Sequence, residues 1–119
     1  MVKDTKEIAE IAVKALEHKK AKDIVLLGIY KVSTIADFFV IASGASFVQV
    51  KALADEVDKK MFEAGINLHH KEGYSDARWV LLDYGDVVVH IFHDRERAFY
   101  DLERLWRDAE KVELDILDI

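Results

Sequence analysis

The sequence predicts one α/β domain, a single mixed sheet of about five strands with flanking helices. The chain has 119 residues, the size of one domain. Apolar residues recur at helical spacing in some segments and form short strand-like runs in others. No proline or internal repeat divides the chain. We therefore expect one domain over residues 1–119, with residues 110–119 forming a tail that is either flexible or docked.

Three helices are expected, each preceded by a side chain that can cap it. The first should cover Thr5–Lys20, the second should follow Ser46 and end at Gly65, and the third should cover Arg95–Arg107. The expected caps are Asp4, Ser46 and Asp94. Apolar stripes at helical spacing should face the sheet. In the first two helices they are Ile8, Ile11, Ala12, Ala15 and Leu16, then Val50, Leu53, Ala54, Val57 and Met61.

The expected strands are Asp23–Ile29, Asp37–Ala42, Asn67–His70, Trp79–Tyr84 and Val87–Phe92. The first two are nearly continuous apolar runs, which is typical of strands covered on both faces. Glu72–Arg78 is polar and should form a loop. The last two strands flank Gly85 and Asp86, and glycine at the first loop position favours a two-residue type II′ hairpin.

This predicted hairpin has two unlike faces, because side chains alternate along a strand. One face pairs Tyr84 with Val87, Leu82 with Val89 and Val80 with Ile91, and suits the core. The other pairs Asp83 with Val88, Leu81 with His90 and Trp79 with Phe92. An apolar face that also carries an imidazole and a carboxylate is either covered by a helix that satisfies them or used to bind a protein. The residues alone leave both interpretations open.

Composition excludes several classes of function. The absence of cysteine excludes disulfides, thiolate metal sites and cysteine nucleophiles. A net charge of −6 argues against sequence-specific nucleic-acid binding, which needs a clustered basic patch. No apolar run is long enough to span a bilayer. We expect no signal or transit peptide and a cytoplasmic protein.

No motif indicates catalysis, a metal or a cofactor. His69, His70, His90 and His93 lack zinc-type spacing. The turn Ser43–Ser46 resembles a phosphate-binding turn but lacks the lysine and glycines of such motifs, so an ordinary capped turn is favoured.

Several stretches resemble the ribosomal silencing factor family, also called Iojap-like. They are Ala36–Ser46 with Gln49 and Val50, Glu72–Gly73, Trp79–Phe92, and Arg97–Trp106 with Asp108 and Ala109. The resemblance spans nearly the whole chain, and its Trp79–Phe92 string is the most specific part.

The resemblance implies a nucleotidyltransferase-like fold without catalytic residues. It also implies a homodimer when free, and binding to the large ribosomal subunit through its ribosomal protein number fourteen, which blocks joining of the small subunit and represses translation. The residues that this implies as partner contacts are Glu72, Trp79, Leu81, Asp83, Tyr84, Asp86, His90 and Phe92. The alternatives are a nucleotide-binding or nucleotidyltransferase-like enzyme and a dimeric protein scaffold.

Overall fold

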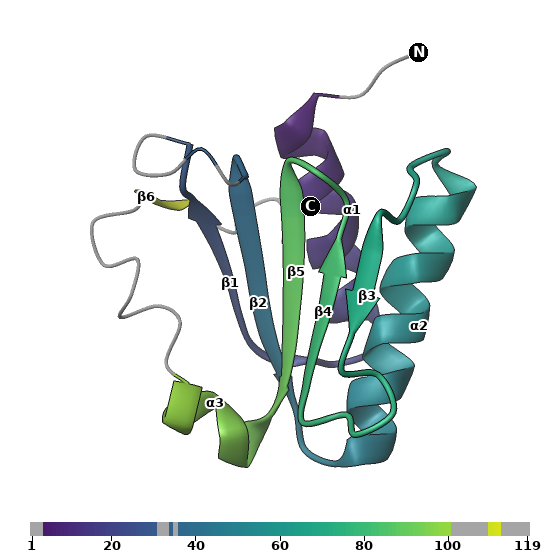
Figure 1. Ribbon diagram of the computed structural model, residues 1–119, viewed down its shortest axis with the longest axis vertical. Helices are drawn as coiled ribbons and strands as arrows, with labels where there is room; N and C mark the ends of the chain where they lie inside the picture. Colours follow the sequence, from purple (N-terminus) through teal and green to yellow (C-terminus); the bar gives the residue numbers. More distant parts are fainter. Residues whose placement is uncertain (1–3, 31–33, 35, 101–109, 113–119) are drawn as a thin grey trace.

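The computed structural model describes residues 4–30, 34, 36–100 and 110–112. It contains one sheet with helices packed against it (Figure 1). The helices are α1 (Thr5–His18), α2 (Phe47–Glu63) and α3 (Asp94–Tyr100). The strands are β1 (Lys22–Gly28), β2 (Phe38–Gly44), β3 (His70–Glu72), β4 (Trp79–Asp83), β5 (Val87–His93) and β6 (Glu110–Val112).

The sheet has the strand order β3-β4-β5-β2-β1-β6. Strands β2 and β5 pair in parallel at its centre, and the other neighbours are antiparallel. The predicted mixed sheet with flanking helices is confirmed. The additional strand is β6, which falls in the predicted tail and pairs with the outer edge of β1.

Helices α1 and α2 lie together on one face of the sheet (Figure 1). All five apolar residues predicted to line α2 are buried there, as are Ala12, Ala15 and Leu16 of α1. The six residues assigned to the core face of the hairpin belong to the same apolar cluster. A smaller cluster lies on the opposite face of the sheet, and within the described residues it contains no helix side chain. Its fully enclosed members are Leu27, Ile29, Ala36, Phe39, Ile41, Val88 and Phe92.

Two local predictions need correction. Strand β3 begins at His70 rather than Asn67, because its pairing with β4 (His70 with Asp83, Glu72 with Leu81) decides where the ladder forms. The cap of α3 is His93 instead of Asp94, since the His93 Nδ1 accepts from the Arg95 N–H at 3.2 Å. Asp94 forms an ion pair with Lys22 at 3.6 Å.

The predicted third helix extends beyond the described part of α3. Residues 101–109, and the side chains of Ala98 and Phe99, lie outside the described residues. Within the described residues, no helix is long and apolar enough to cross a membrane.

The two long helices end in the same backbone motif with different residues. After α2, Gly65 has a φ of +77°, and the Ile66 and Gly65 N–H groups donate to the Met61 and Phe62 carbonyls. After α1, Lys20 takes the equivalent position with a φ of +61°. A lysine there bears a steric cost that glycine avoids.

We therefore expect Lys20→Gly to raise the free energy of unfolding by about 1 kcal/mol. Urea denaturation of the variant and the wild-type chain measures this change. Lys19→Gly is the matched control, because Lys19 has a φ of −99° and glycine there adds only unfolded-state entropy. Equal effects of the two substitutions would contradict the explanation.

Candidate protein-binding surface

Strands β4 and β5 form the hairpin in the register that its two-residue loop predicts. The structure pairs Trp79 with Phe92, Leu81 with His90, and Asp83 with Val88. The loop is closed by the Tyr84 N–H, which donates to the Val87 carbonyl at 2.9 Å. Gly85 has a φ of +91° and Asp86 is not in the left-handed region, as a type II′ turn requires at its first and second loop positions.

One face of this hairpin, extended by β3, brings together most of the predicted contact residues. Residues paired across neighbouring strands point to the same side, so Glu72 on β3 shares a face with its partner Leu81. We call this surface the hairpin face. It consists of Glu72 on β3, Trp79, Leu81 and Asp83 on β4, and Val88, His90 and Phe92 on β5.

The hairpin face is open toward β3 and closed toward the sheet centre. Glu72 is exposed, and the three β4 residues are partly exposed. On β5, His90 is 4% exposed and Phe92 0%. The β5 half of the face is therefore buried, and the β4 half reaches solvent.

Trp79 stands on the boundary between the two halves and is held by two neighbours. Its ring stacks on Phe92 with centroids 5.1 Å apart and planes 23° from parallel. Its indole Nε1–H donates to His90 Nδ1 at 3.1 Å. The ring of Trp79 is partly exposed and already ordered in the folded protein. A partner that binds it therefore gains apolar contact with little further loss of side-chain entropy.

His90 is enclosed by aromatic rings. The Phe39 ring from β2 lies 4.6 Å from the His90 ring between centroids, and Trp79 lies on the other strand. Burial lowers the pKa of His90 to about 4. Among the described residues, its buried Nε2 has no hydrogen-bond partner. The contribution of Phe39 could not be recognised from the sequence, because β2 becomes the neighbour of β5 only in the folded sheet.

The acidic candidates lie at the open side and at the turn. Asp83 Oδ1 accepts from the Gly85 N–H at 2.8 Å, which holds the turn. The Asp86 backbone carbonyl accepts from the Asp37 and Phe38 N–H groups at 2.8 and 3.0 Å. Asp86 itself is exposed. Glu72 lies 3.3 Å from the exposed His70. These acids give the open half of the hairpin face an anionic border.

Tyr84 lies on the opposite side of the hairpin and is 5% exposed. Its hydroxyl donates to Asp58 Oδ1 on α2 at 3.1 Å. Burial, and next the nearby Asp58 carboxylate, raises the pKa of Tyr84 far above the ordinary value for tyrosine. Tyr84 therefore anchors the hairpin to α2 and does not share the hairpin face.

Comparison with known proteins places this geometry in a family. Residues 2–118 match the family model described as "Ribosomal silencing factor during starvation". The chain belongs to the ribosomal silencing factor family. Ribosome-related regulation of translation follows from that membership.

Individual members of the family are similar over nearly their whole length. The ribosomal silencing factor of Halalkalibacterium halodurans is 52% identical over 92% of this chain and 93% of its own. That of Bacillus subtilis is 47% identical over the same shares. A crystal structure of a Chromobacterium violaceum protein superposes with a TM-score of 0.87 at 40% identity, covering 93% of this chain and 92% of that one.

The Ser43–Ser46 turn is occupied by its own side chains. Ser46 Oγ accepts from the Gln49 N–H at 3.0 Å, and Gln49 Oε1 accepts from the Ala45 N–H at 2.6 Å. The buried Ser43 Oγ accepts from Arg97 Nη1 at 2.9 Å. These contacts form an ordinary helix cap, which engages the Ala45 and Gln49 amides.

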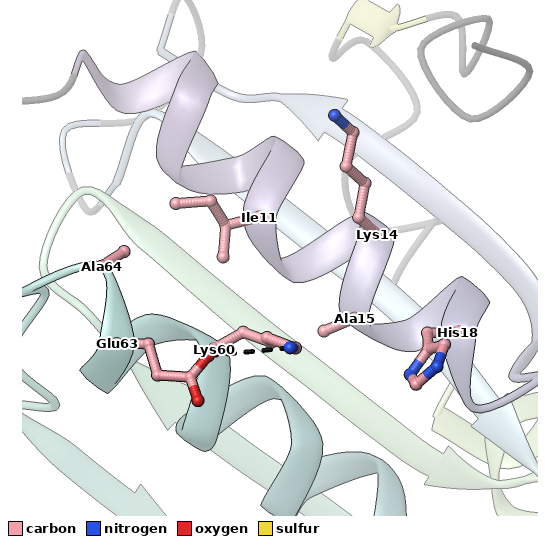
Figure 2. Close-up of a pocket in the computed structure, with 7 residues that line it drawn as sticks. All are labelled: Ile11, Lys14, Ala15, His18, Lys60, Glu63 and Ala64. Carbon is pink, nitrogen blue, oxygen red and sulfur yellow. Dashed lines mark ion pairs between the residues drawn. The ribbon is translucent and has the colours of Figure 1, made fainter.

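A hollow lies between α1 and α2, on the side away from the sheet (Figure 2). Its volume is about 400 Å³, and its lining is Ile11, Lys14, Ala15, His18, Lys60, Glu63 and Ala64. The charges around it are largely paired within the protein. Lys60 lies 3.6 Å from Glu63, and His18 Nδ1 lies 3.1 Å from the buried Glu56. This pairing leaves little net charge to select a ligand.

No cluster of three or more potential metal ligands occurs among the described residues. The adjacent His69 and His70 are exposed, and His90 and His93 lie on β5 with opposite orientations.

Proposed function

We propose that this silencing factor binds the large ribosomal subunit through ribosomal protein number fourteen and blocks joining of the small subunit. The observation that carries the proposal is Trp79, partly exposed yet fixed by Phe92 and His90 on an apolar face with an acidic border. Buried aromatic anchors surrounded by polar residues are typical of binding hot spots.

In this proposal the direct contacts are the accessible members of the predicted set. Trp79 and Leu81 supply apolar area, and Glu72, Asp83 and Asp86 meet basic side chains of the ribosomal protein. His90 and Phe92 support the surface from beneath, and Tyr84 anchors it to α2. A net charge of −6 favours encounter with a basic partner and speeds association more than it adds affinity.

The proposed mechanism needs no catalytic step, and the protein is not an enzyme in this account. A factor bound at the joining face makes the joined state sterically unfavourable. At a concentration of 100 times its dissociation constant, mass action contributes about 2.7 kcal/mol against joining. The capping bonds that Ser46 and Gln49 make at the Ser43–Ser46 turn support this account over nucleotide transfer.

The proposal also places the factor in the cytoplasm, where ribosomal subunits join, and makes it a homodimer when free. Partly exposed Trp79 and Leu81 favour a covered hairpin face when the ribosome is absent. Gel filtration of the free chain, with and without large subunits, tests the dimer, and a monomer at all concentrations would exclude it.

Trp79→Ala is expected to weaken binding to large subunits at least tenfold, the loss expected for a hot-spot tryptophan. Co-sedimentation of the variant with purified large subunits measures this loss. Circular dichroism must show that the variant is folded, because Trp79 also packs on Phe92.

The control is Phe62→Ala. Phe62 is an aromatic residue on α2 that is 81% exposed, and α2 packs on the other face of the sheet. This variant should bind normally. Unchanged binding by folded Trp79→Ala, or equal losses in both variants, would refute the hairpin face as the contact surface.

A further inference from the structure

The contact between Trp79 and His90 has a defined direction. Indole Nε1–H is a donor only, so in the 3.1 Å hydrogen bond His90 Nδ1 must be the acceptor. A neutral imidazole with a lone pair on Nδ1 carries its proton on Nε2. That same Nε2 is the buried atom of His90 that has no hydrogen-bond partner among the described residues. The Nδ1 nitrogen is the one that holds the tryptophan.

His90 does not itself reach the surface of the hairpin face. It is 4% exposed and lies between the rings of Phe39 and Trp79. Its effect on anything that docks there must pass through the side chain above it. Trp79 is that side chain, because it is partly exposed and is hydrogen-bonded to His90.

Two charged groups on elements around His90 are engaged elsewhere. Asp83 on β4 accepts from the Gly85 N–H. Arg97 on α3 donates to the Ser43 hydroxyl. Burial alone therefore accounts for the preference of His90 for the neutral form, the form that can accept from Trp79.

We propose that His90 is a positioning residue, whose Nδ1 lone pair fixes the Trp79 indole in the orientation that binds the ribosomal partner. This inference rests on the proposed function and deepens it. It assigns His90 a role through Trp79 in place of the direct contact implied by the family resemblance. It also explains why a polar ring occupies an otherwise apolar site.

A double-mutant cycle tests the proposal. The four proteins are the wild-type chain, His90→Leu, Trp79→Phe and the double variant, with binding to purified large subunits as the measurement. His90→Leu removes the acceptor and keeps apolar bulk, and we expect about tenfold weaker binding, the upper end for one net hydrogen bond. Trp79→Phe removes the indole donor, so in that background His90→Leu should have no further effect.

A conservative variant separates positioning from simple destabilisation. His90→Asn places an amide oxygen near the position of Nδ1, and it should restore most of the affinity that His90→Leu loses. In the free protein, the indole N–H of Trp79 can be followed by ¹⁵N NMR, with Trp106→Phe assigning the two tryptophan signals. His90→Leu should shift this resonance and speed its exchange with solvent, and His90→Asn should not.

The outcomes distinguish the two levels of the proposal. Equal losses from His90→Leu in the wild-type and Trp79→Phe backgrounds, or an unchanged indole resonance, would overturn the positioning role alone. No binding of the wild-type chain to large subunits would overturn the proposed function and the positioning role with it.

Discussion

Gly73→Ala should destabilise the protein by about 3 kcal/mol, more than its unusual backbone conformation alone would cost. Gly73 has a φ of +77°, and a Cβ built there would overlap the Trp79 carbonyl oxygen. The obstacle is backbone, so no change of rotamer can relieve it. The Gly73 carbonyl also accepts from the Ala77 N–H at 2.9 Å, which closes the loop before β4. Accommodating the methyl group would therefore displace the start of β4.

Gly65→Ala provides a matched control for this prediction. Gly65 has the same φ of +77°, but a Cβ there meets nothing within 4 Å. Gly65→Ala should lower the free energy of unfolding by only about 1 kcal/mol, the cost of placing an alanine in the left-handed conformation. The melting temperature should therefore fall roughly 10 °C further in Gly73→Ala than in Gly65→Ala, at about 4–8 °C per kcal/mol. Equal losses would show that the close approach to Trp79 is not important for stability.

Acidification should destabilise the protein through His90. Its pKa falls from 6.5 in the unfolded chain to about 4 in the folded one, so between these values the unfolded state binds more protons. Stability therefore falls as pH drops through 6.5 and levels off below about 4. The full effect is about 3 kcal/mol, of which about 2 kcal/mol is lost between pH 7 and pH 5.

Urea denaturation at several pH values, with His90→Asn as the reference, isolates this contribution. The variant lacks the titrating ring, so its unfolding free energy should fall about 2 kcal/mol less than that of the wild-type chain from pH 7 to pH 5. Contributions from all other groups are common to both proteins and cancel in the difference. Parallel curves would show that His90 is accessible to protons in the folded state.

The hairpin was the most predictable part of the fold, for a physical reason. A two-residue loop fixes the register of the two strands that it joins. The cross-strand partners of Trp79, Leu81 and Asp83 can therefore be assigned from the sequence. The cap at Ser46 and the turn at Gly65 were equally local and equally readable. In each case the side chains that decide the structure lie within a few residues of one another.

The parts of the fold that depend on long-range contacts could not be predicted from the sequence in the same way. That Phe92 and His90 are enclosed depends on β2 beside β5, where Ile41 pairs with His90. No local pattern specifies that pairing. Likewise, the alternation of β4 and β5 indicated which residues share a face, but not that Phe39 would pack against His90. The prediction for the cap of α3 is wrong because the helix already begins at Asp94, so His93 takes the cap position, and a histidine ring is an uncommon cap.

The central parallel pair also has a consequence for how the chain is made. The register joins Phe38 to Val87 and Gly44 to His93, so β2 leaves the ribosome long before its partner. Non-local pairings of this kind slow folding, whereas a β-hairpin closes in about 1–10 μs. During synthesis β4 and β5 can therefore pair soon after they emerge, while β2 keeps an open edge until then. The middle of the sheet is completed only when nearly the whole domain has been translated.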